Sequence, residues 1–326
     1  MNLKESSVRI LLALYRHEIM TPFQLAIHTN YHIDYIYKST TQLVKEQLIN
    51  KQSVPFVHRA AKAYYLTKKS YEWVSEMVKE TDRVKSKTWE GPTGDIISVL
   101  VSNQFYTELI AKTKEDYSSG LIEWLGKKDA GDRYAQFNEK DQRLIPYSPQ
   151  SYSIIQIPKG RAIVHVEVLT GDETMSVIED YITTGIKSLQ AYWLEDTPKV
   201  SMLFLCLTPT IIPSILKIWD TVEQRLPGLK PMIGAAFFHD LIQQGILSDA
   251  WNLRQRKGSL YDFAIFPPMA VSPTRFIGKQ VIPQFASIGS QLWGSRKGEI
   301  QNKENQLPLL DTDQSKCKEE EEIFYS

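Results

Sequence analysis

The chain has 326 residues, 42% hydrophobic and 23% charged, a composition typical of a folded globular protein and not of a disordered or fibrous one. Its 38 basic and 38 acidic side chains give a formal net charge of zero, which excludes a net field of the whole chain that attracts nucleic acid. Two cysteines, Cys206 and Cys317, exclude a disulfide framework. No stretch approaches about 18 uncharged apolar residues or resembles a signal peptide, so we expect a cytoplasmic protein without a membrane partner.

The charge is nevertheless uneven along the chain. Residues 1–88 contain fourteen Lys or Arg and eight Asp or Glu, so the N-terminal quarter is basic and the remainder compensates. Any attraction to DNA therefore has to come from this local surplus, because the chain as a whole is neutral.

Three helical patterns open the chain. The first helix can be capped by Ser6 or Ser7, and its apolar residues recur at helical spacing: Val8, Leu11, Leu12 and Tyr15. The second begins at a capping box, in which the side chains of Thr21 and Gln24 satisfy free backbone amides, and it stops by Thr29. A third helix is predicted over residues 33–47, after a short turn.

The third predicted helix has one apolar and one polar face. Its inner face follows the i, i+3, i+4, i+7 pattern and is predicted to pack on the first two helices: Ile33, Ile36, Tyr37, Thr40, Leu43 and Val44. The outer face carries hydrogen-bonding side chains and two positive charges: Asp34, Tyr35, Lys38, Ser39, Thr41, Gln42 and Lys45. Such side chains reach base edges and phosphates in a major groove, while Asp34 also suits the helix dipole in the first turn.

A β-hairpin with a basic tip is predicted to follow. An extended segment begins at Leu48, residues 55–62 carry His58, Arg59 and Lys62, and residues 63–66 alternate as a second strand. Thr67 then caps a fourth helix. This order predicts a winged helix-turn-helix domain over residues 1–80, with DNA-binding candidates on the third helix and the hairpin: Tyr35, Lys38, Ser39, Thr41, Gln42, Lys45, His58, Arg59 and Lys62. A protein-docking role of the same domain is the alternative.

Residues 81–95 are polar and contain Gly91-Pro92-Thr93-Gly94, so they are predicted to be a linker. Residues 96–297 alternate between helical and strand patterns and predict an α/β domain with a mixed sheet, which makes the fold class α+β. Its expected elements are a long helix, a loop or irregular strand pair, a hairpin and then alternating strands and helices: 96–114, 126–143, 154–157 with 162–169, 174–193, 200–207, 209–225, 232–238, a short helical piece through Gln244, and 260–266. The uniformly apolar segment 200–207 is expected to be central, and the acidic tail 298–326 to be disordered.

The strand pattern around Glu167 bears on catalysis. In an extended strand Arg161, Ile163, His165, Glu167 and Leu169 share one face, and the alternating apolar residues occupy the other. Nucleases that use a divalent metal bring several carboxylates and a lysine together on such strands. His28 and His32 are four residues apart, but a break between helix and turn separates them, so we do not expect a metal pair there.

Several short motifs occur in a fixed order between about Ser7 and Trp193. They include Val101-Ser102-Asn103-Gln104-Phe105-Tyr106, Trp124, Leu144-Ile145-Pro146-Tyr147, and Val164-His165-Val166-Glu167-Val168-Leu169-Thr170-Gly171, with Glu173-Thr174, Lys187 and Tyr192 after them. In these motifs the sequence resembles the plasmid replication-relaxation family. The resemblance implies a winged helix joined to a restriction-endonuclease-like domain.

The resemblance also indicates where the chain departs from the family. Members have Pro-Asp where this chain has Pro146-Tyr147, and Glu-x-Asp where it has Glu167-Val168-Leu169. Two expected carboxylates are thus replaced by Tyr147 and Leu169, and only Glu167 and Lys187 remain as candidates for catalysis. One carboxylate is a poor magnesium site, because Mg²⁺ dehydrates reluctantly. We therefore interpret the domain as a scaffold without phosphodiester cleavage, lacking metal and cofactor.

Three functions stay open on the sequence. The first is a double-stranded DNA-binding protein of a plasmid or mobile element that acts in replication, DNA relaxation or their regulation, with replication or relaxation proteins as partners. The second is a nuclease or nickase that uses Glu167, Lys187, Mg²⁺ and a displaced carboxylate, Asp172 or Glu173. The third is a protein-interaction module. A palindromic DNA target would imply a homodimer.

Overall fold

The computed structural model describes residues 3–56, 59–82, 95–116, 118–127, 129–130, 148–158, 160–192, 200–225, 232–264, 266, 268 and 276–277. The chain divides into a compact unit, residues 1–289, and a second unit, residues 290–326, and every described residue belongs to the first. The predicted tail, most of the predicted linker and most of the predicted loop 126–143 lie outside the described residues. Within them the fold is α+β, with eight α-helices, a three-stranded sheet and a seven-stranded mixed sheet.

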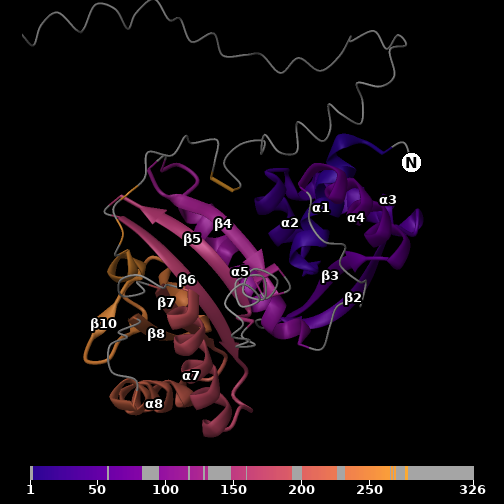
Figure 1. The fold of residues 1–326 in the computed structure, drawn as a ribbon. Coiled ribbons are helices and arrows are strands. Elements are labelled where there is room, and N and C mark those ends of the chain that lie inside the picture. Colours follow the sequence, from indigo (N-terminus) through magenta and orange to yellow (C-terminus); the bar gives the residue numbers. More distant parts are fainter. Residues whose placement is uncertain are drawn as a thin grey trace, which may run out of the picture. The chain divides into compact units, whose positions relative to one another are not determined.

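The N-terminal part consists of helices around a small antiparallel sheet (Figure 1). Its elements in chain order are α1 (Glu5–His17), β1 (Ile19–Met20), α2 (Pro22–Thr29), α3 (Ile33–Lys45), β2 (Ile49–Phe56), β3 (Arg59–Leu66) and α4 (Lys68–Asp82). The strand order is β1-β3-β2, so β3 is central and β2–β3 form a long hairpin. The helix patterns were therefore predicted in the right order.

Two helix ends differ from the sequence prediction. Helix α1 begins at Glu5, and its N-cap is Lys4, which makes no side-chain capping bond. The proposed caps, Ser6 and Ser7, lie inside the helix, and the Ser6 hydroxyl is hydrogen-bonded to the Tyr35 hydroxyl. Helix α4 extends to Asp82, beyond the predicted start of the linker at residue 81, while Thr67 accepts a hydrogen bond from the Ser70 amide as expected of a cap.

The larger sheet follows in the second part of the chain. Its elements are α5 (Ile96–Lys112), β4 (Gly120–Gly126), β5 (Ser151–Ile157), β6 (Gly160–Leu169), α7 (Met175–Tyr192), β7 (Val200–Cys206), η1 (Pro209–Ile211), α8 (Ile212–Arg225), β8 (Met232–Phe237), α9 (Phe238–Gln244), β9 (Trp251–Asn252), β10 (Lys257–Gly258) and η2 (Leu260–Phe263). The strand order is β10-β9-β8-β7-β6-β5-β4. Strand β7 is fourth of seven, so the prediction of a central strand there is confirmed.

Strands β6, β7 and β8 run parallel and the outer pairs are antiparallel. The two parallel connections pass through α7 and α8, which pack against each other on one face of the sheet (Figure 1). On β6 the alternation is as predicted: Ala162, Val164, Val166 and Val168 join the core shared with α5, whereas Leu169 joins the core under α7 and α8. Glu167 and His165 therefore belong by strand alternation to the face of Leu169.

The predicted strand 260–266 is wrong. Residues Leu260–Phe263 form a 3-10 helix whose capping box joins Ser259 and Asp262. Among the described residues of this segment, Phe266 pairs with the sheet through a single bridge to Arg161. Strand β4 was not predicted, because a register shift between Leu121 and Glu123 interrupts its alternation.

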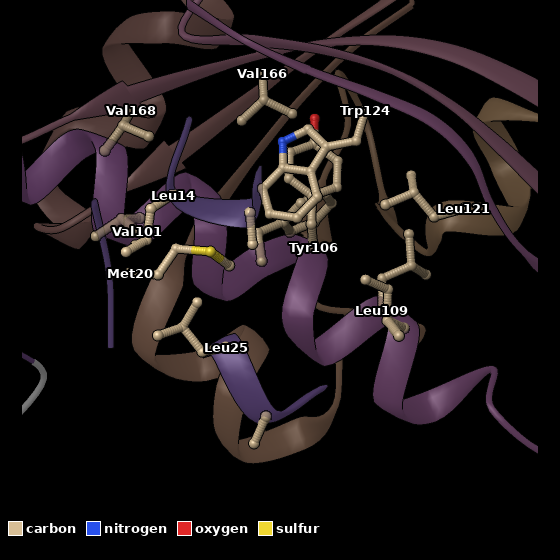
Figure 2. Packing of buried hydrophobic residues seen from close by; sticks show 14 of the residues in the cluster. Leu14, Met20, Leu25, Val101, Tyr106, Leu109, Leu121, Trp124, Val166 and Val168 are labelled. Atoms are coloured by element: carbon tan, nitrogen blue, oxygen red, sulfur yellow. The ribbon is translucent and has the colours of Figure 1, made fainter. Parts of the chain in front are cut away.

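Helix α5 joins the N-terminal part to the sheet. Its buried residues Val101, Tyr106 and Leu109 pack between the N-terminal residues Leu14, Met20 and Leu25 and the sheet residues Leu121, Trp124, Val166 and Val168 (Figure 2). Buried polar groups fix the same junction, since Gln24 donates from its amide to the Leu100 carbonyl at 3.0 Å. The N-terminal helices and the sheet thus share one continuous apolar core.

Candidate nucleic-acid interface

The turn between α2 and α3 fixes how α3 is presented. Thr21 and Gln24 form the predicted capping box at the start of α2. Asn30 ends α2 in the left-handed conformation, φ 58°, and its backbone N–H donates to the Ala26 and Ile27 carbonyls. Asparagine tolerates this conformation better than most residues, so the local sequence favours a sharp turn before α3.

The inner face of α3 anchors the helix. Ile36, Thr40 and Leu43 are fully buried, and Ile33 and Val44 are partly buried against the same core. The prediction that Tyr37 belongs to this face is wrong, because its side chain is 49% exposed. Successive helical residues are about 100° apart, so Tyr37 falls at the margin of a buried face centred on Ile36 and Leu43.

The outer face of α3 presents a row of exposed side chains, here called the α3 ridge. It consists of Asp34, Lys38, Thr41 and Lys45, spaced i, i+4, i+7 and i+11 on one side of the helix. All four are exposed, and none contributes to the apolar core. Both lysines lie on this ridge, so the positive charge of α3 points away from the core.

The other predicted residues of α3, Tyr35, Ser39 and Gln42, lie on one flank of the ridge, and two of them contact other side chains. The Tyr35 hydroxyl is 2.6 Å from Ser6 Oγ, and its ring lies 5.3 Å from that of Tyr31. The Gln42 amide donates to Glu46 Oε1 at 2.6 Å. Ser39 is half-buried. The structure therefore divides the seven residues of the predicted outer face into an exposed ridge and a flank whose Tyr35 and Gln42 contact other side chains.

The hairpin adds exposed lysines. Lys62 is exposed on β3 and is paired with Ser53 on β2. Lys51, which the sequence prediction did not single out, is exposed on β2 and shares that face by alternation. Arg59 is the first residue of β3, and its side chain lies outside the described residues, as does His58. The sequence signal for Lys51 is its position as a lysine early in the extended segment that was predicted to begin at Leu48.

The candidate catalytic residues are only partly described. Glu167 is 7% exposed on β6, and its Oε2 accepts a hydrogen bond from the Gln150 amide at 3.3 Å. Leu169, at the position of an expected carboxylate, is fully buried in apolar surroundings under α7 and α8. Lys187 lies on α7, but its side chain and Tyr147 are outside the described residues. Among the described residues, Glu167 belongs to no cluster of three or more His, Cys, Asp or Glu that could hold a metal ion.

Glu173 has a structural task of its own. Its two carboxylate oxygens accept hydrogen bonds from the Thr170 and Gly171 amides, each at 2.8 Å. Burial raises the pKa of Glu173, but these hydrogen bonds outweigh that effect, and the pKa lies below its ordinary value. Glu173 therefore closes the loop after β6, where Gly171 adopts φ 108°. Within the described ranges, no cluster of three or more His, Cys, Asp or Glu could hold a metal ion.

Comparisons with protein-family models, with curated proteins and with solved structures found no match to this chain. In the part of the chain that the structure describes, none of the helices is long and apolar enough to span a membrane. Inferences about function therefore rest on the side chains, above all on the α3 ridge and the hairpin.

Proposed function

We propose that the chain binds double-stranded DNA through α3 and the β2–β3 hairpin, in the manner of a winged helix-turn-helix domain. The α3 ridge carries this proposal. It presents two lysines, a threonine and a carboxylate on a helix whose opposite face is anchored by Ile36, Thr40 and Leu43. A helix of this polarity fits a major groove, and lysines are the groups that neutralise phosphates.

The order of elements supports the winged-helix part of the proposal. Three helices precede a hairpin, and the sharp turn at Asn30 sets α3 after α2 as in a helix-turn-helix. Lys51 and Lys62 on one face of the hairpin would supply further phosphate contacts, as a wing does. Phosphate contacts of this kind position a protein on the duplex without reading its sequence.

The mixed sheet supports a restriction-endonuclease-like second part. Three parallel strands are flanked by antiparallel ones, and Glu167 stands on β6 where the resemblance to replication-relaxation proteins places a carboxylate. We therefore propose that the chain serves replication or DNA relaxation of a plasmid or mobile element, or regulates it. With apolar Leu169 in place of a second carboxylate, the sheet acts as a scaffold and not as a nuclease.

Titration of labelled duplex pools with the full chain tests DNA binding. We expect affinity to fall linearly with the logarithm of the salt concentration, because each neutralised phosphate releases counterions. Lys38→Ala and Lys62→Ala should each weaken binding to all sequences and reduce the salt slope by about one. Lys217→Ala is the matched control, because Lys217 is an exposed lysine on α8, far along the chain from the ridge.

Two results would overturn the proposal: no duplex binding at low salt, or binding that neither Lys38→Ala nor Lys62→Ala weakens. A stable protein complex formed without DNA would instead favour the docking alternative. Sequencing of the bound fragments would also identify the target, and a palindrome with half-sites about one helical turn apart would indicate a homodimer.

A further inference from the structure

Asp34 is the acidic member of the α3 ridge and is difficult to reconcile with phosphate binding alone. Its side chain is 75% exposed, and its carboxylate lies 3.4 Å from the exposed ring of His32. The position, in the first turn of α3, favours a negative charge through the helix dipole. The same charge on a surface that meets DNA is repelled by every phosphate nearby, so it weakens non-specific binding.

A carboxylate on such a surface is favourable where it meets a hydrogen-bond donor of a base. In the major groove the cytosine edge offers its amino group, whereas the adenine amino group lies beside N7, an acceptor that repels a carboxylate. Lys38 is one helical turn further along the ridge and is a pure donor, which suits the O6 and N7 acceptors of guanine. The two residues together thus complement the two halves of a C·G pair.

We infer that Asp34 is a specificity-determining residue that, together with Lys38, selects a C·G base pair in the target. This inference rests on the proposed DNA-binding function and deepens it. The carboxylate lowers the affinity for sequences without this base pair, and at a C·G pair its hydrogen bond to cytosine offsets that loss. Asp34 therefore increases the ratio of specific to non-specific affinity more than it increases the specific affinity itself.

The other two ridge residues, Thr41 and Lys45, are less suited than Asp34 and Lys38 to contact base edges. The Thr41 hydroxyl donates to the Tyr37 carbonyl at 2.7 Å, so its proton is engaged within the helix. Thr41 therefore cannot donate to a guanine without breaking that bond. Lys45 is the last residue of α3, away from the N-terminal turns that approach base edges in helix-turn-helix proteins, and so is placed to contact phosphate.

Selection of bound sequences from a randomised duplex pool tests the inference with the full chain. The wild-type protein should prefer C·G at one position of the recovered site. Asp34→Asn should change that preference to A·T by about 10-fold, because an amide pairs with adenine N6 and N7, and the other positions should stay unchanged. Asp34→Ala should weaken the preference there, leaving only the contribution of Lys38, and should bind unrelated sequences more tightly.

Glu72→Gln is the matched control, since it removes an exposed carboxylate on α4 that is paired with Lys68 and lies outside α3. Thermal unfolding should show all variants folded. If the wild type selects a sequence and Asp34→Asn selects the same one, the inference fails while DNA binding stands. The inference also fails alone if the wild type binds duplexes without preference. Both fail if no duplex is bound.

Discussion

His17 and His28 place their Nε2 atoms 3.0 Å apart in the interior, and the His17 ring stacks on Trp124 with 3.7 Å between ring centroids. The three side chains come from α1, α2 and β4, so the contact joins the N-terminal helices to the edge of the larger sheet. One imidazole must donate and the other accept, so the accepting ring has to be uncharged. Burial, and the nearby Arg16, lower the pKa of His28 from 6.5 to about 4.

Acid should therefore destabilise the fold through this pair. The folded pKa of His28 lies below its unfolded value, so its contribution is fully present above pH 6.5 and is lost as the pH falls from 6.5 toward 4. Between pH 7 and pH 5 we expect a loss of about 2 kcal/mol in the free energy of unfolding from this residue. Urea unfolding of the wild type and of His28→Gln at both pH values measures the contribution of His28 to this loss, because glutamine does not titrate.

His239→Gln is the control for the pH experiment, since His239 is a partly exposed histidine on α9 whose replacement leaves the buried pair intact. The wild type and His239→Gln should lose the same stability on acidification, and His28→Gln should lose less. Equal losses in all three proteins would contradict the role given to the pair.

The sequence predicted elements whose signals are local. The capping box at Thr21, the alternation of Val164 and Val166 against Glu167, and the apolar strand β7 all follow from patterns within a few residues, and each is present. The prediction for Tyr37 was wrong because helical periodicity shows the centre of a buried face but not how far the face extends around the helix. Ser6 looked like a helix cap, and only the fold brings it to Tyr35, 29 residues away.

Contacts between segments distant in the sequence could not be predicted from local patterns. His28 was weighed against His32, four residues away, whereas its actual neighbours are His17 and Trp124. No local pattern indicates that three elements meet at this point. On the candidate interface, helical spacing identified most of the side chains of α3 that face outward, but it could not show that Tyr35 and Gln42 contact other side chains.

Asn103 on α5 should be critical for the junction between the N-terminal helices and the sheet. Its amide nitrogen donates to the carbonyls of His17 at 3.1 Å and of Ile19 at 2.7 Å. These carbonyls flank Glu18, which adopts φ 63° at the end of α1. Asn103→Ala leaves both carbonyls buried without this donor, so we expect a loss of about 3 kcal/mol in the free energy of unfolding, measured in urea at pH 7.

Asn252→Ala is the comparison for Asn103. The Asn252 amide donates to a single carbonyl, that of Ala235, at 2.9 Å, and its side chain is only partly buried. Loss of this hydrogen bond should lower the free energy of unfolding by about 1 kcal/mol. If Asn103→Ala costs no more than Asn252→Ala, the two hydrogen bonds around Glu18 do not hold the junction.

The chain should not cleave DNA, and Glu167 is the residue on which this prediction depends. Glu167 accepts the Gln150 amide in a buried position, and Leu169 supplies no second carboxylate on the same face. The described residues contain no cluster of three or more His, Cys, Asp or Glu that could hold a metal ion, so supercoiled plasmid should stay intact with Mg²⁺ or Mn²⁺ at concentrations of protein that shift labelled duplex. Glu167→Gln should bind DNA as the wild type does, because the residue belongs to the sheet and not to the α3 ridge. Nicking by the wild type that Glu167→Gln abolishes would establish the nuclease alternative, whereas nicking that survives the substitution would indicate a contaminating enzyme.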